Sequence, residues 1–233
     1  MIVGVHQPNF FPWLGYFDKL NKSDVFILLD DVQFPRGGAG AYSNRVKLFI
    51  AGESRWVTAP IERKFQGTRK INEMVLHADI AWRRKMIKTI ETNYKKAKFF
   101  DLTFPFLQDL ILDPEENLAL FNSSAIHSIC NKLGLDTGKI SQSSKLEHQG
   151  DSNQLLISLT RAVGGSTYMS GSGGASSYLD ETVFNEAGIM VQHQEFVHPE
   201  YFQHSSTVFQ PGLSIIDAIM NLGFEGTRQI LEN

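Results

Sequence analysis

A histidine and two amide side chains follow the first apolar segment of the chain, where they could bind or activate a ligand. The stretch MIVGV runs into His6 and Gln7, and Asn9 follows two residues later. An imidazole can accept or deliver a proton, and amides can hydrogen-bond a polar ligand. Pro8 and Pro12 restrict the backbone and would hold the imidazole in place. We interpret His6 as a candidate catalytic residue; the alternative is a histidine that caps a strand beside aromatic packing.

Two adjacent carboxylates follow the second apolar segment. The run 25–29 is apolar and ends at Asp30 and Asp31. Adjacent residues of an extended chain point to opposite faces, so we expect at most one of the two to face a ligand. Asp31, which would share its face with Gln33, would orient His6 or a sugar hydroxyl. The alternative is a turn at a strand end, where aspartate is favoured.

Groups suited to an anion occur at two further places. Asn44 and Arg45 follow a glycine-rich stretch, and a guanidinium can bind a phosphate or carboxylate through two donors. Ser170 and Gly171 begin the stretch SGSGG, whose small residues would let backbone N–H groups approach an anion. This stretch is neither a Walker loop nor a G-x-G-x-x-G fingerprint. A solvated arginine and a flexible loop are the alternatives.

Histidines gather in the later stretch QHQEFVHPEYFQHSS. Here Tyr201 and Gln203 would line a pocket that hydrogen-bonds a polar ligand. The spacing of His193, His198 and His204 matches no standard metal-ligand signature, so we predict no metal site. No cofactor is predicted either, although an activated acyl or nucleotide donor would suit these groups.

The composition predicts a folded protein of the cytoplasm. Of the 233 residues, 42% are hydrophobic, which is enough to form a buried core. The charged share of 20% argues against a disordered chain. The net charge of −3 argues against overall electrostatic binding of nucleic acid. A single cysteine, Cys130, favours a reducing compartment. The sequence shows no membrane-spanning run and no signal peptide, so we expect neither a membrane span nor secretion.

The hydrophobic patterns predict an α/β fold. A strand over 1–5, a helix over 12–21 and a strand over 25–29 form a βαβ unit. The first half of the chain should add a hairpin of 46–50 and 55–61, a strand over 71–76 and a helix over 78–100. A helix from Pro114 to Leu133 should follow, with Asp113 as its N-cap and Gly134 as its end. The second half should contain a helix over 153–163, a strand over 167–170, a short helix after the glycine-rich stretch, a strand over 189–195, and a helix over 214–222 that is capped by Ser214 and Asp217 and ended by Gly223. We expect one Rossmann-like domain, residues 1–233, with a largely parallel sheet, flanking helices, a hairpin insertion and a polar loop or linker at 136–153.

The chain resembles the WbqC-like protein family, and the resemblance covers nearly its whole length. The motifs that carry it are, in order, His6-Gln7-Pro8, Pro12-Trp13-x-Gly15-Tyr16, Ser23-Asp24-Val25-Phe26, Asp30-Asp31-Val32-Gln33-Phe34, Asn44-Arg45, Trp56-x-Thr58-x-Pro60, Tyr168-x-Ser170-Gly171 with Tyr178-Leu179, His198-Pro199-x-Tyr201-x-Gln203, and Leu213-Ser214-x-x-Asp217. A longer glycine- and alanine-rich loop at 37–41 departs from the family pattern.

The resemblance implies a bacterial protein connected with O-antigen and other surface polysaccharides, whose family members are suspected of modifying amino sugars. It implies a transferase of acyl or aminoacyl type that acts on a small molecule, a nucleotide-linked amino sugar. His6 and Asp31 would be catalytic. The substrate would be bound by Gln7, Asn9, Trp13, Tyr16, Asp30, Gln33, Asn44, Arg45, Ser170, Gly171, His198, Tyr201 and Gln203.

Two other functions stay open from the sequence. The opening is similar to that of nucleotidylyltransferases, whose H-x-G-H motif binds nucleotide phosphates at a helix N-terminus. His6 and the pair Gly15-Tyr16 would stand in its place, and such an enzyme would use a nucleoside triphosphate. The other alternative is a protein that binds a sugar or nucleotide without catalysis.

Overall fold

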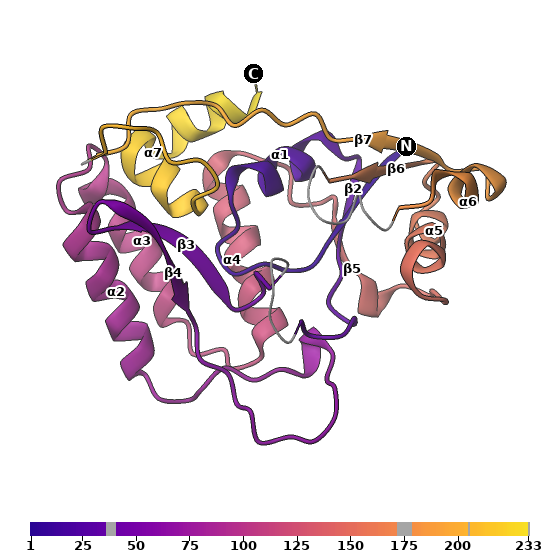
Figure 1. The fold of residues 1–233 in the computed structure, drawn as a ribbon, viewed down its shortest axis with the longest axis horizontal. Coiled ribbons are helices and arrows are strands. Elements are labelled where there is room, and N and C mark those ends of the chain that lie inside the picture. The colour runs from indigo at the N-terminus through magenta and orange to yellow at the C-terminus, as the bar shows by residue number, and fades with distance from the viewer. Residues whose placement is uncertain (36–40, 172–178, 205, 233) are drawn as a thin grey trace.

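A five-stranded parallel sheet lies at the centre of the protein, in a computed structural model that describes residues 1–35, 41–171, 179–204 and 206–232. The strands lie in the order β5-β2-β1-β6-β7, and each pairing is parallel. Their bounds are β1 (Ile2–His6), β2 (Val25–Leu28), β5 (Ile140–Gln142), β6 (Thr167–Ser170) and β7 (Met190–His193). Figure 1 shows them together beside the N-terminus. The predicted α/β fold with a parallel sheet is confirmed.

Successive strands are added first on one side of β1 and then on the other. From β1 the chain proceeds to β2 and β5 on one side, and it then returns to β6 and β7 on the other. The direction therefore reverses between β1 and β6. This is the doubly wound, Rossmann-like order, in which ligands bind outside the carboxyl ends of the strands at the point of reversal.

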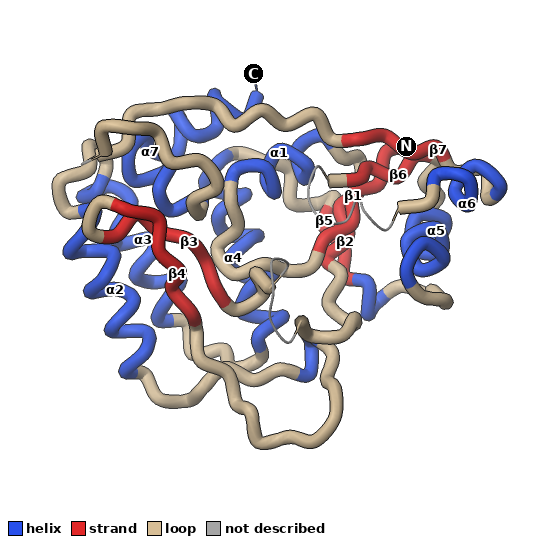
Figure 2. Tube along the Cα trace, in the orientation of Figure 1, coloured by secondary structure: helices blue, strands red, loops and turns tan. Residues whose placement is uncertain are grey.

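Helices cover both faces of the sheet, as Figures 1 and 2 show. Helices α1 (Leu14–Lys22) and α4 (Leu118–Leu133) pack on the face that holds Phe26 and Leu28. Helices α5 (Ser152–Ala162) and α6 (Glu181–Glu186) pack on the opposite face, with Val3 and Val5. Because side chains alternate along a strand, His6 lies on the α1 face.

The crossover from β2 to β5 carries a separate layer. It contains the hairpin of β3 (Arg45–Ile50) and β4 (Glu53–Thr58), followed by α2 (Ala81–Tyr94) and α3 (Phe100–Leu112). The C-terminal helix α7 (Ile215–Glu232) packs against α3, α1 and β3. The predicted hairpin is confirmed.

The strand predicted over 71–76 is wrong. Residues Ile71–Glu73 form the 3-10 helix η1, and Val75 and Leu76 make only isolated bridges. The reason is that the backbone here bonds to loops: the N–H of Asn72 donates to Asp30 O (2.8 Å) and that of Leu76 to Glu116 O (2.7 Å).

The single helix predicted over 78–100 is two helices, because α2 ends at Tyr94 and α3 begins at Phe100. The N–H of Phe99 donates to Met220 O of α7 (3.0 Å), which fixes the turn between them. The helix predicted from Pro114 begins later, at Leu118. Its N-cap is Asn117, whose side chain accepts from the N–H of Leu120, whereas Asp113 lies at the end of α3.

Other helix ends follow the prediction more closely. Gly134, at φ 70°, ends α4. Ser214 precedes α7, and its hydroxyl accepts from the N–H of Ile216 (3.2 Å). Gly223 (φ 73°) breaks the helical backbone as predicted, but the helix resumes and continues to Glu232.

The polar segment 136–153 contributes a strand of the sheet. It contains β5, which pairs with β2 at one edge, and the 3-10 helix η2 (Ser143–Lys145). The elements predicted over 153–163, 167–170 and 189–195 correspond to α5, β6 and β7. In the described part of the chain, no helix has both the length and the apolar character that crossing a membrane requires.

Candidate functional site

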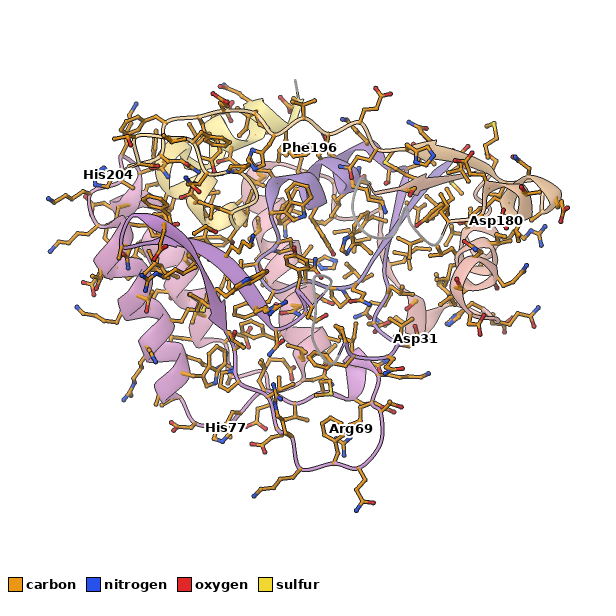
Figure 3. The ribbon with its side chains drawn as sticks, in the orientation of Figure 1. Asp31, Arg69, His77, Asp180, Phe196 and His204 are labelled. Atoms are coloured by element: carbon orange, nitrogen blue, oxygen red, sulfur yellow. The ribbon has the colours of Figure 1, made fainter. Side chains whose placement is uncertain are left out.

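Polar side chains meet at the carboxyl edge of the parallel sheet. Each strand ends there beside at least one of them, and they are His6 at the end of β1, Asp30 and Asp31 after β2, Ser143 after β5, Ser170 at the end of β6 and Gln194 after β7. Because all five strands are parallel, these residues occupy one edge. Figure 3 labels Asp31 there. This edge is the candidate site.

The imidazole of His6 is held in one orientation. Its Nδ1 lies 3.1 Å from Gln7 O, and its ring lies 4.8 Å from the ring of Tyr16. The Tyr16 hydroxyl donates to the same carbonyl (3.3 Å). A carbonyl can only accept, so Nδ1 carries the proton and Nε2 keeps its lone pair. Burial, assisted by the charge of Lys19, lowers the pKa of His6 to about 4, so the ring is neutral at neutral pH.

The two carboxylates after β2 differ in their surroundings. Asp30 is buried and accepts from both the N–H (3.0 Å) and the hydroxyl (2.7 Å) of Ser144. Asp31 is partly exposed and pairs with His148. The hydroxyl of Ser143 reaches both carboxylates, because the chain turns directly after β2. Asp31 is therefore the one that a ligand can approach, and its described partners are Ser143 and His148 rather than His6.

His148 is a site residue that sequence reasoning missed. Its Nε2 lies 3.0 Å from Asp31 Oδ2 and its Nδ1 lies 2.9 Å from Leu146 O. Both partners are acceptors, so only the imidazolium makes both hydrogen bonds. Nothing in the sequence around His148 marks it, because its partner Asp31 is far away in the chain.

The turn after β1 is packed rather than open. Asn122 of α4 donates from its amide to Pro8 O (2.8 Å) and to Ser43 O (2.7 Å). Asn9 is buried, and the side chain of Gln7 accepts from the hydroxyl of Ser43 (3.4 Å). Gln7 and Ser43 therefore connect the His6 side of the edge to the start of the hairpin.

Asn44 and Arg45 are bonded within the hairpin region. The Asn44 amide donates to Ala59 O (2.9 Å), and Arg45 Nε donates to Ala41 O (2.6 Å). The guanidinium lies 4.2 Å from the centre of the Trp56 ring. Gln33 is exposed and makes an isolated bridge with Lys70.

The C-terminal motifs converge on Asp217 of α7. Its carboxylate accepts from the hydroxyls of Tyr94 (3.0 Å) and Tyr201 (2.7 Å) and from the amide of Gln203 (2.9 Å). Burial raises the pKa of Asp217, and these donors oppose the rise. Asp217 therefore does not complete a capping box, and Tyr201 and Gln203 both donate to this carboxylate. His198 stacks on Trp13 (6.3 Å between ring centroids), so the motif that begins at Pro12 packs against the motif that begins at His198.

A family model spans almost all of these motifs. The model of the WbqC-like protein family matches residues 7–229. The chain belongs to this family. It is also 30% identical over 224 residues to a Mycobacterium tuberculosis (strain ATCC 25618 / H37Rv) protein described as "Uncharacterized protein Rv1507c", which covers 96% of this chain and 94% of the relative. No solved structure matches.

In this WbqC-like protein, the start of the glycine-rich stretch lies at the point of reversal. Ser170 is fully buried, and its carbonyl accepts from the N–H of Gln194 (2.8 Å). Gly171 follows it, and the remainder of the stretch, 172–178, lies outside the described residues. The short helix predicted after it is α6.

A hollow of about 540 Å³ lies beside the edge strand of the WbqC-like fold. It is formed by Ser123 and His127 of α4 and by Ile140, Gln142 and Lys145 around β5. His6 is not among its lining residues, so this hollow is separate from the point of reversal. Within the described residues, no group of three or more His, Cys, Asp or Glu side chains could hold a metal ion.

Proposed function

We propose that this WbqC-like protein is a transferase that moves an acyl or aminoacyl group to a nucleotide-linked amino sugar used for bacterial surface polysaccharides. One observation carries the proposal. His6, with Nδ1 committed to Gln7 O and Nε2 left as an acceptor, lies where the strand order reverses. A neutral imidazole at that place offers the lone pair of Nε2 to a proton of a bound nucleophile.

The transfer step would use Nε2 of His6 as the base. The amine nitrogen of the acceptor attacks the acyl carbon and loses a proton to Nε2. The bond between that carbon and the leaving group, a thiolate or a phosphate oxygen, then breaks, and the leaving group receives the proton from His6. The contact with Tyr16 and the bond to Gln7 O keep the ring in place during both transfers.

Asp31 would orient a sugar hydroxyl in this scheme. Its carboxylate is fixed by Ser143 and His148, and its side chain is 11% exposed, so it can still accept a hydrogen bond from a ligand. A carboxylate held in this way needs little reorganisation when the ligand binds.

Nucleotidylyl transfer is a second candidate, favoured by the doubly wound strand order and by the contact between His6 and Tyr16. Tyr16, however, is buried and donates its hydroxyl to Gln7 O, so it offers no second donor for a phosphate. This candidate requires magnesium-dependent binding of a nucleoside triphosphate.

The test is a reaction screen on the full chain. Uridine- and thymidine-diphosphate amino sugars are incubated with acyl thioesters or acyl phosphates, and products are detected by mass spectrometry. We expect an N-acylated sugar whose formation falls at least a hundredfold in His6→Gln, in keeping with the usual contribution of a general base. His77→Gln serves as the matched control, because His77 is half exposed and contacts Glu62.

Two results would overturn the proposed transfer. Binding of the nucleotide sugar without any product would favour a non-catalytic binding protein. Consumption of a nucleoside triphosphate in the presence of magnesium, with release of pyrophosphate, would favour nucleotidylyl transfer.

A further inference from the structure

Lys19 is a buried lysine that neither the motifs nor the proposed transfer step uses. It lies in α1, and only 2% of its surface is exposed. Its ammonium donates to Val5 O (2.9 Å) and lies 5.6 Å from the centre of the Tyr168 ring. Its charge is also felt at His6, where it helps to lower the pKa.

The bond to Val5 places the ammonium at the reversal point. The pairing of β1 with β6 ends at Gly4 and Met169. The carbonyl of His6 accepts from the N–H of Leu29, after β2, at 2.8 Å. Because successive carbonyls of a strand point to opposite sides, the carbonyl of Val5 points toward β6. If the pairing of β1 with β6 continued by one more hydrogen bond, the N–H of Gly171 would donate to the Val5 carbonyl. The Lys19 ammonium donates to this carbonyl instead.

This ammonium has no carboxylate partner among the described residues. Its sequence neighbour Asp18 is bonded to Lys22 (2.8 Å) and to the amide of Gln194 (2.6 Å). None of the residues 36–40, 172–178, 205 and 233 has a carboxylate side chain. Burial lowers the pKa of Lys19 to about 7, and no charge opposes that effect.

An ammonium has three donors, and Val5 O uses one of them. A buried, unpaired charge is costly unless something compensates it. Among the described atoms, a Cβ added at Gly171 would meet only Gln194 Oε1, at 4.0 Å.

We propose that Lys19 binds an anionic group of the ligand, a phosphate or a carboxylate, between the ends of β1 and β6. The proposal rests on the proposed function in its choice of ligand, because a nucleotide-linked sugar carries a diphosphate. A bound anion would supply the counter-charge that the described side chains do not provide and would place the ligand beside Nε2 of His6.

A structural role for Lys19 predicts different behaviour. If the ammonium only holds the Val5 carbonyl, Lys19→Met lowers stability and leaves any response to anions unchanged. If the ammonium serves to bind an anion, Lys19→Met removes an uncompensated charge. The variant is then at least as stable as wild type without anion, and its response to anions is lost.

The experiment is thermal unfolding of the full chain at pH 7 with inorganic phosphate, pyrophosphate or acetate, at constant ionic strength. The variants are Lys19→Met and, as a matched control on the same helix, Lys22→Met, whose side chain is 47% exposed. With the anion at about ten times its Kd for the wild type, we expect the Tm of the wild type and of the control to rise by about 3–6 °C and the Tm of Lys19→Met to stay the same.

Comparing phosphate and pyrophosphate with acetate shows whether Lys19 prefers a phosphate or a carboxylate. A flat response of the wild type to all three anions, or an equal response of Lys19→Met, overturns the proposal. If Lys19→Met does not fold, the wild-type protein labelled with ¹⁵N-lysine is measured by NMR instead. The signal of the buried ammonium should shift when the anion that raises the Tm is added. A signal that does not move overturns the proposal.

The two proposals fail separately. An anion response without any transferase product leaves Lys19 as an anion-binding residue and removes the transferase. Transferase product with an unchanged KM for the nucleotide sugar in Lys19→Met removes the role of Lys19 and leaves the transferase.

Discussion

His148 Nε2 lies 3.0 Å from Asp31 Oδ2, and this pair ties the end of β2 to the segment that follows β5. The other ring nitrogen lies 2.9 Å from Leu146 O, so the pair also fixes the turn after η2. A carboxylate of the candidate site is thereby held by a residue from the other side of the long crossover.

The pair is expected to stabilise the fold as a coupled unit. Asp31→Asn and His148→Asn should each lower the free energy of unfolding by about 1–2 kcal/mol, because each leaves a partly buried partner without its charged contact. Urea denaturation at pH 6 of both variants and of the double variant should give a coupling energy of about 1 kcal/mol. Simple additivity would show that the contact contributes nothing of its own.

Asp217 is expected to be a point of high sensitivity. Asp217→Ala leaves the hydroxyls of Tyr94 and Tyr201 and the amide of Gln203 without their shared acceptor, so we expect a loss of about 3–5 kcal/mol in unfolding free energy. Asp101→Ala on the exposed side of α3 is the control and should change stability by less than about 0.5 kcal/mol. If Asp217→Ala lowers the free energy of unfolding by as little as the control does, the three donors do not depend on this carboxylate.

Gly15→Ala is expected to destabilise the protein, because a Cβ there would lie 2.3 Å from the Trp13 ring. Helix propensity alone would make Gly15→Ala stabilising by about 1 kcal/mol. The clash should outweigh this gain and give a net loss of about 1–3 kcal/mol. Thermal unfolding of Gly15→Ala with and without Trp13→Leu tests the cause: if the smaller side chain at position 13 gives no rescue, the clash is not responsible.

The pKa of His6 gives the stability a specific pH dependence. The pKa is about 4 in the folded protein, whereas the pKa of a solvated histidine, as in the unfolded chain, is 6.5. Between these values the unfolded chain binds more protons, so this contribution to stability falls as the pH falls from 6.5 to 4 and is constant above 6.5. Replacing His6 with Gln should reduce the stability lost between pH 7 and pH 4 by about 3 kcal/mol. Parallel curves for wild type and variant would contradict the lowered pKa.

The strand edge could be predicted from the sequence because local patterns determine where β1, β2 and β6 end. Apolar runs followed by His6 or by Asp30 and Asp31 mark these ends, and the βαβ connection makes the strands parallel. The family resemblance added the order of the motifs. It could not show that Tyr201 and Gln203 bond Asp217.

The features that were not predicted depend on contacts across long distances in the chain. Ile140-Ser141-Gln142 has little strand character by itself and becomes a strand only because β2 lies beside it. His148 acquires its role from Asp31. Lys19 has one weak signal: its position one helical turn after Tyr16 places a lysine on the packed side of α1.

The central strand of the sheet has a bearing on how the protein is made. Val3 of β1 pairs with Val25 on one side but with Tyr168 on the other, so β1 keeps one bare edge until most of the chain has left the ribosome. Unpaired strand edges invite pairing with other chains, and late, distant pairings slow folding. Chains truncated before residue 167 should therefore aggregate, and the space between His6 and Ser170 comes into existence only late in synthesis.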